Sequence, residues 1–285
     1  MKRSYVILLT ACVNPGGMPF TVLNDTSERL RQYREALNFY LNETTFPIVF
    51  CENTLCDFSE DYKEYIASGR LEYITFDGNN FDKSRGKGYG EALIIEEAFR
   101  HSRLLDQCNF VVKITGRLIV RNISQLVKDN RRMFTDTIQT FYPNNNMADS
   151  RLVILPKLFC IVDFLARKDS INDTEGYYFE HLLYDTIISR KKYVYIPFLH
   201  VPLIDGVSGS TGNVYKSDTN KSNPHCFAFD MLGNALKMNS LFQNYDMPLY
   251  IRSTIWMSRI ILNFMRCLYI ITKVSHTHRS SCSGD

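Results

Sequence analysis

Cationic and hydroxyl side chains alternate at the end of an apolar stretch in the middle of the chain. If residues 110–117 form a β-strand that continues this far, Lys113, Thr115 and Arg117 lie on one face of it. Two cations at a strand end can stabilise the negative charge that develops on a leaving group, as a metal ion would. We therefore expect Lys113 and Arg117 to act in catalysis without a metal ion.

A second cationic segment, residues 77–91, leads into a predicted helix. It carries glycines at positions 86, 88 and 90 and cations at 83, 85 and 87. Backbone N–H groups at a helix N-terminus, together with nearby positive charge, form a binding site for phosphate. The segment matches neither the Walker A loop nor a GxGxxG motif after the first strand. A flexible glycine-rich turn with solvated lysines is the alternative interpretation.

Small residues follow the first apolar run, in the segment from Thr10 to Pro19. Such residues let a ligand approach the backbone closely at the carboxyl end of a parallel strand. The second predicted strand ends in Glu52 and Asn53, where a carboxylate can accept a hydrogen bond from a ribose or a base. A solvated loop acid is the alternative for Glu52.

Three carboxylates in the second half are candidates for a general base that takes a proton from an attacking hydroxyl group. Glu180 and Glu175 flank the start of a predicted helix, and Asp149 follows an asparagine-rich segment. The neighbouring His181 could assist. A first-turn acid stabilised by the helix dipole is the alternative for Glu180.

Short apolar runs alternate with longer amphipathic segments in the first half, which is typical of βαβ units with a parallel sheet. The predicted strands are Tyr5–Ala11, Pro47–Cys51, Leu71–Thr75, Phe110–Ile114 and Leu152–Pro156. The predicted helices are Ser27–Asn42 and Gly88–Leu105, each with one apolar stripe. The sequence therefore predicts an α/β fold, Rossmann-like, with a mostly parallel central sheet flanked by helices.

The second half is less regular. It predicts a helix over Gly176–Ile188, a strand over Lys192–Ile196 and a long surface loop over Asp205–Pro224. We expect one catalytic domain over residues 1–248, in which residues 1–117 bind the nucleotide and residues 118–248 bind the acceptor. Residues 275–285 are expected to be a disordered tail.

The segment 249–274 differs from the rest of the chain. Its polar and basic side chains are spaced to form one stripe of a helix, and apolar side chains cover the remainder; the stripe consists of Arg252, Arg259, Asn263, Arg266 and Lys273. This pattern favours an amphipathic helix lying on an anionic membrane surface. Docking on the core or on a second subunit, in a homo-oligomer, is the alternative.

Composition restricts the class of protein and its compartment. The formal net charge is only +3, so the chain lacks the concentrated basic surface expected of a nucleic-acid binder. The eight cysteines include no CxxC pair and mostly lie in apolar runs, which is typical of free buried thiols in a reducing compartment. Although residues 2–12 imitate a secretory signal, Asn14-Pro15-Gly16-Gly17 follows at once, as it would after a buried strand. We therefore expect a cytoplasmic location.

Four blocks carry a family resemblance that extends over roughly residues 4–205: Thr10–Pro15, Gly86–Glu91, Lys113–Arg117 and Tyr178–His181. They resemble GT-A-type glycosyltransferases of bacterial capsule and lipopolysaccharide (O-antigen) loci that lack the Asp-x-Asp pair, some of which are similar to galactofuranosyltransferases. The resemblance implies that the first three blocks hold a nucleotide sugar and that Glu180 lies near the acceptor. The donor-binding residues so expected are Thr10, Ala11, Asn14, Glu52, Asn53, Lys87, Gly88, Tyr89, Gly90, Thr115, Gly116 and Arg151.

The resemblance implies transfer of galactose, galactofuranose or another hexose from a UDP-sugar to a glycan or lipid-linked glycan acceptor. We expect an inverting reaction that needs no metal and no cofactor besides the nucleotide sugar, at the inner face of the plasma membrane. A nucleotidyltransferase, a methyltransferase or a non-catalytic scaffold of envelope assembly are the alternatives.

Overall fold

The computed structural model describes residues 3–133, 136–140, 146–190, 192–196 and 198–217, together with Met257. The amphipathic helix predicted over 249–274, apart from Met257, and the tail predicted over 275–285 lie outside the described residues. So do residues 143–145 of the asparagine-rich break.

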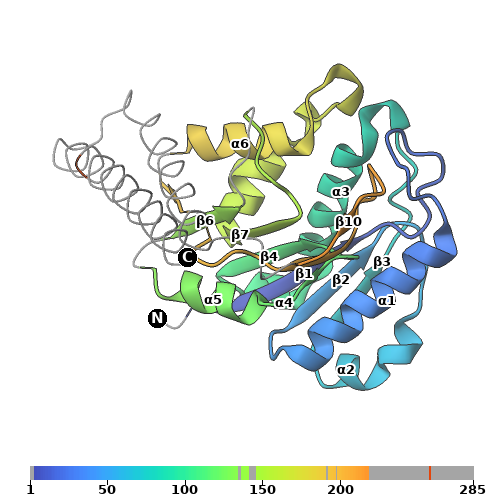
Figure 1. Cartoon of the computed structure of the whole chain (residues 1–285), viewed down its shortest axis with the longest axis horizontal. Helices are drawn as coiled ribbons and strands as arrows, with labels where there is room; N and C mark the ends of the chain where they lie inside the picture. The colour runs from blue at the N-terminus through green and yellow to red at the C-terminus, as the bar shows by residue number, and fades with distance from the viewer. Residues whose placement is uncertain are drawn as a thin grey trace, which may run out of the picture.

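A seven-stranded sheet forms the centre of the molecule, in the order β3-β2-β1-β4-β7-β6-β8 (Figure 1). Its strands are β1 (Tyr5–Ala11), β2 (Ile48–Glu52), β3 (Leu71–Thr75), β4 (Phe110–Thr115), β6 (Thr137–Thr140), β7 (Leu152–Pro156) and β8 (Val194–Tyr195). The first four are parallel, whereas β7 is antiparallel to both β4 and β6. The predicted α/β class with a mostly parallel sheet is confirmed.

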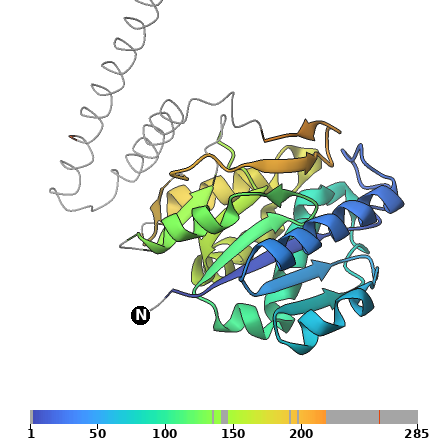
Figure 2. The ribbon, with the colours of Figure 1, turned by 60° about the horizontal axis from the view of Figure 1, so that its bottom comes forward.

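Helices cover both faces of this sheet. On one face α1 (Thr26–Glu43) packs its apolar stripe, including Tyr33, Leu37 and Tyr40, against alternate residues of β1. On the other face α3 (Gly86–His101) and α6 (Phe179–Ser189) contact the intervening residues. Figures 1 and 2 show α1 and α3 on opposite sides of the sheet. Because both faces are covered, every residue of β1 and β2 is buried.

Two predicted helices differ in their bounds from the structure. The prediction over 88–105 is divided into α3 and α4 (Arg103–Gln107), because Ser102 ends the first and its hydroxyl accepts the Leu105 N–H at 3.0 Å. The helix predicted from Gly176 begins at Phe179, since Gly176 has a left-handed φ of 79° and His181 Nδ1 accepts the Tyr178 N–H at 3.1 Å.

Two short strands interrupt the long loop that is predicted over 205–224, so the prediction is wrong at those residues. Residues Ile204–Val207 form β9 and Val214–Tyr215 form β10, and β9 also pairs with β5 (Ile119–Val120) to give a three-stranded sheet. Asp205 secures this hairpin by accepting the Ser217 N–H at 2.7 Å and by pairing with Arg121. Residues 218–224 lie outside the described ranges.

The remaining elements are short. They are α2 (Lys63–Ala67), α5 (Ile123–Arg131), 3-10 turns at Ser59–Tyr62, Lys83–Arg85, Leu165–Ser170 and Asp173–Glu175, and a π-helical turn at Phe159–Phe164. Within the described ranges no helix is long and apolar enough to cross a membrane. The five described cysteines, at 12, 51, 56, 108 and 160, are free thiols.

Candidate active site

A cavity of about 530 Å³ lies at the carboxyl ends of β1 and β4, between the N-termini of α3 and α6 and the β9–β10 hairpin. Eleven of the residues expected to act in the site line it: Thr10, Ala11, Asn53, Lys87, Gly88, Gly90, Thr115, Arg117, Asp149, Arg151 and Glu180. Six do not: Asn14, Glu52, Tyr89, Lys113, Gly116 and Glu175. The structure therefore gathers residues from both halves of the chain at one sheet edge.

Arg117 is a buried cation of this cavity, with a relative exposure of 6%. Its Nη1 donates to Gln32 Oε1 at 3.1 Å and to the Val207 carbonyl at 2.9 Å, both of which are neutral acceptors. Among the described residues no carboxylate lies within ion-pair distance of it, and its buried Nε has no hydrogen-bond partner. A guanidinium held in this way is prepared to receive an anion.

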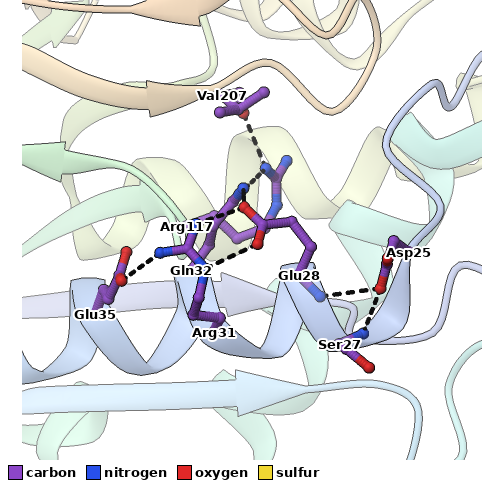
Figure 3. Close-up of polar contacts among 8 residues, drawn as sticks. All are labelled: Asp25, Ser27, Glu28, Arg31, Gln32, Glu35, Arg117 and Val207. Carbon is purple, nitrogen blue, oxygen red and sulfur yellow. Dashed lines mark hydrogen bonds and ion pairs between the residues drawn. The ribbon is translucent and has the colours of Figure 1, made fainter.

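The polar residues behind Arg117 belong to α1 (Figure 3). Gln32 accepts from Arg117 and donates through Nε2 to Glu28 Oε1 at 2.7 Å, so its amide is fixed from both sides. Glu28 is also bound by Arg31, whose Nε donates to its carboxylate at 2.8 Å. Gln32 is therefore a positioning residue for Arg117, one that sequence reasoning missed because it lies 85 residues away along the chain.

Arg29 is a second buried arginine of the cavity lining that the sequence did not indicate. Its Nε donates to the Cys12 carbonyl at 2.9 Å and its Nη1 to the Leu23 carbonyl at 3.0 Å. The Cys12 N–H in turn donates to the Tyr33 hydroxyl at 2.9 Å. Burial raises the pKa of the Cys12 thiol to about 11, so this side chain is a neutral thiol at neutral pH. The hydrogen bonds of Arg29 to the Cys12 and Leu23 carbonyls order the loop after β1.

The expected leaving-group role of Lys113 is not matched by its position, because Lys113 does not line the cavity. Its ammonium group forms an ion pair with Glu91 and donates to the Ser150 carbonyl at 2.6 Å. Glu91 lines the cavity, and its Oε1 also accepts a hydrogen bond from the Thr10 hydroxyl group at 2.9 Å. Lys113 thus lies behind Glu91 and acts on the cavity through it. The sequence did not indicate Glu91 as a site residue, although this position belongs to the glycine-rich segment 77–91.

Glu180 lies at the first turn of α6 and is half-buried. The Ser150 hydroxyl donates to its Oε1 at 2.6 Å. Burial raises the pKa of the Glu180 carboxyl group, and the nearby Glu91 raises it further, whereas the Ser150 hydrogen bond and Lys113 lower it. A carboxylate with a raised pKa in a cavity is a stronger proton acceptor than an exposed one.

Asp149 and Arg151 both line the cavity and pair with each other, the Arg151 Nε lying 2.9 Å from Asp149 Oδ2. Asp149 also accepts the Arg151 N–H at 2.9 Å. This pairing makes Asp149 a weaker base candidate than Glu180. Glu175 is exposed and lies outside the lining, which separates it from the other candidate bases.

The phosphate site expected at the N-terminus of α3 contains a protein carboxylate. Asp173 Oδ2 accepts the Gly88 N–H at 3.1 Å. Gly86 and Gly88 make room for it, since a Cβ at Gly86 would lie 2.3 Å from the Asp173 carboxylate. The helix end is thus occupied by an internal anion, and the phosphate interpretation of this N-terminus is corrected. Lys87 instead reaches across the cavity mouth to Ser210 of the hairpin.

Glu52 is fully buried and serves the backbone of the neighbouring loops. Its carboxylate accepts the N–H groups of Val13 at 3.0 Å, Thr54 at 2.8 Å and Cys56 at 2.9 Å. Both oxygens are therefore used, and the expectation that Glu52 binds a ribose or a base is corrected. The adjacent Asn53 does line the cavity, and its buried Oδ1 has no hydrogen-bond partner among the described residues.

Across the described ranges no three His, Cys, Asp or Glu side chains gather as a set of metal ligands. No protein-family model and no curated protein matches the sequence. Solved structures with a similar overall arrangement include a protein from Desulfovibrio desulfuricans described as a nucleotide-diphospho-sugar transferase. It has 13% identity, a TM-score of 0.41 and coverage of 86% of this chain and 100% of that chain.

Two further similar structures are also described as sugar transferases. One is a glycosyltransferase involved in the glycosylation of the major capsid of PBCV-1, with 9% identity, a TM-score of 0.39 and coverage of 70% of this chain and 84% of that one. The other is the mannosyltransferase Ktr4p from S. cerevisiae, with 11% identity, a TM-score of 0.41 and coverage of 78% and 76%.

Proposed function

We propose that this chain is a GT-A-type glycosyltransferase that moves a hexose, such as galactose or galactofuranose, from UDP to a hydroxyl group of a glycan acceptor. The observation that carries the proposal is Arg117, a buried cation without a carboxylate partner among the described residues, in the same cavity as Glu180. A diphosphate supplies the anion that Arg117 lacks. The four blocks of family resemblance support the same reaction.

The reaction we propose is an inverting displacement. An acceptor hydroxyl oxygen attacks the anomeric carbon, and its proton passes to the Glu180 carboxylate. The bond between the anomeric carbon and the β-phosphate oxygen breaks, and its electron pair leaves with the diphosphate. Arg117 stabilises the charge that accumulates there. Ser150 orients the Glu180 carboxylate through the 2.6 Å hydrogen bond.

Thermal melting with added ligands tests this proposal. UDP and UDP-sugars should raise the melting temperature, because a ligand that binds only the folded state stabilises it. Stabilisation by S-adenosylmethionine alone would indicate a methyltransferase, and the absence of any nucleotide effect would indicate a scaffold. A hydrolysis panel of UDP-, GDP- and dTDP-sugars then identifies the donor, and failure to release any nucleoside diphosphate would contradict the proposal.

We also propose that residues 249–274 bring the enzyme to an anionic membrane surface, where a lipid-linked glycan of a capsule or O-antigen would be the acceptor. The basic stripe of the sequence supports this proposal. Deletion of residues 249–285 should reduce co-sedimentation with vesicles that contain anionic lipid and leave binding to neutral vesicles unchanged. Equal sedimentation of both proteins would remove the membrane assignment.

A further inference from the structure

Asp173 is buried in the cavity wall, with a relative exposure of 3%, and one of its oxygens is unused. Oδ2 accepts the Gly88 N–H at 3.1 Å, whereas the buried Oδ1 has no hydrogen-bond partner among the described residues. A buried acceptor without a partner is unfavourable in the empty protein. The arrangement becomes favourable when a ligand donates to Oδ1.

Gly86 and Gly88 allow the Asp173 carboxylate to lie close to the start of α3. A Cβ at Gly86 would meet the Asp173 carboxylate at 2.3 Å, and a Cβ at Gly88 would meet Oδ1 at 2.8 Å. Two glycines at this helix start therefore leave the space that the carboxylate fills. Burial raises the pKa of the Asp173 carboxyl group, which agrees with a site from which water is largely removed.

The two sides of the cavity carry opposite charge. Arg117 and Arg29 approach from the α1 side of the sheet, where their side chains contact Gln32 and the Cys12 carbonyl. Asp173 lies on the α3 side, against Gly86 and Gly88.

Two further carboxylates, Glu91 and Glu180, line the cavity on the same side as Asp173. Glu91 is paired with Lys113, and the ammonium group of Lys87 is directed to Ser210 and the Phe20 carbonyl. A ligand that spans the cavity therefore meets cations at one end and carboxylates at the other.

We infer that Asp173 Oδ1 accepts a hydrogen bond from a hydroxyl or ammonium group of the transferred sugar, so that the donor carries a neutral or amino sugar and not a uronic acid. The inference rests on the proposed function, in which Arg117 holds the diphosphate; the sugar attached to that diphosphate then extends toward the α3 side of the cavity. A carboxylate accepts hydrogen bonds and donates none, which suits a hydroxyl group. A sugar carboxylate would instead meet a like charge in a site with little water.

Titration calorimetry at neutral pH tests this inference with UDP and two matched donor pairs. The pairs are UDP-glucose with UDP-glucuronate, and UDP-galactose with UDP-galacturonate; the members of each differ only in oxidation at C6. In the wild-type protein the preferred neutral donor should bind about tenfold or more tightly than its uronate. Equal binding of both members, with UDP itself bound, would overturn the inference and leave the proposed function in place. No binding of UDP would remove both.

Asp173→Asn, which keeps an acceptor for Gly88, provides the second measurement. The variant should bind the neutral donor roughly tenfold more weakly and bind UDP as tightly as the wild type does. The preference for the neutral donor over the uronate should fall by about the same factor. Asp169→Asn is the matched control, because Asp169 is exposed and lies outside the cavity lining. An unchanged preference for the neutral donor over its uronate in a folded Asp173→Asn protein would overturn the inference. If that variant does not fold, the comparison of the two donors in the wild-type protein tests the inference alone.

Discussion

Replacement of Arg117 by alanine should remove most activity at a small cost in stability. The wild-type side chain forms two hydrogen bonds to neutral acceptors, at 3.1 and 2.9 Å. Hydrogen bonds of a charged group contribute about 1.5–3 kcal/mol each, but burial of a cation costs several kcal/mol. Because these contributions offset each other, we expect the free energy of unfolding to change by less than about 2 kcal/mol.

Donor binding and turnover should respond much more strongly. Loss of the charged contact to the diphosphate, about 1.5–3 kcal/mol, corresponds to roughly 10- to 150-fold weaker UDP binding. Loss of a preorganised donor at a leaving group typically lowers kcat about 10²–10³-fold. Calorimetry with UDP and a UDP-release assay measure the two effects. Arg100→Ala is the matched control, because Arg100 is exposed on α3 and pairs with Glu97 outside the cavity lining. An Arg117→Ala rate near that of the control would refute the role of Arg117.

Three further changes test other parts of the site. Glu180→Gln should abolish the fall of kcat at acid pH. In the wild type the midpoint of this fall should lie above pH ~4.3, the ordinary glutamate pKa, because burial raises the pKa of Glu180. Because the pKa of the Glu180 carboxyl group is raised in the folded protein, the ionised group destabilises the fold at neutral pH and the protonated group does not at low pH. The glutamine variant should therefore melt at a higher temperature than wild type at neutral pH and at the same temperature at low pH. An unchanged loss of kcat at acid pH in this variant would exclude Glu180 as the base. Gly86→Ala should cost about 3 kcal/mol or more in urea unfolding, because φ is 82° and the new Cβ meets Asp173, whereas Gly176→Ala, at φ 79° with free space, should cost about 1 kcal/mol. Similar losses of unfolding free energy in the two variants would show that the Asp173 carboxylate moves away from the new Cβ at little cost. Donor turnover should survive EDTA; a loss restored by Mn²⁺ would contradict the metal-free mechanism.

The parallel half of the fold could be predicted from the sequence because strands covered on both faces are continuously apolar. The helix predicted over Ser27–Asn42 agrees with α1 to within one residue at each end. The β9–β10 hairpin could not be predicted in the same way. Its strands are short, and β9 contains Asp205 and Gly206. β9 pairs with β5, which lies 86 residues earlier at the Ile119–Asp205 pair. Local patterns carry no information on such a distant partner.

The candidate site was predictable where chemistry depends on residue type and was missed where it depends on pairing. Arg117 and Glu180 could be chosen as a cation and a carboxylate at element ends, and both line the cavity. Lys113 has the same residue chemistry as Arg117, but its ammonium group is taken by Glu91. Asp173 gave no signal because it precedes the predicted helix, and its contact with Gly88 crosses 85 residues.

The reversed direction of β7 determines which segment of the chain reaches the candidate site. The Thr115 N–H donates to the Arg151 carbonyl at 3.0 Å, and Ile114 pairs with Leu152, so the residues preceding β7 arrive where β4 ends. A parallel strand would bring its following segment to this edge; β7 brings its preceding one, which contains Asp149 and Ser150. In the proposed glycosyltransferase, substitutions in this segment can therefore change acceptor preference without altering the strands of the central sheet.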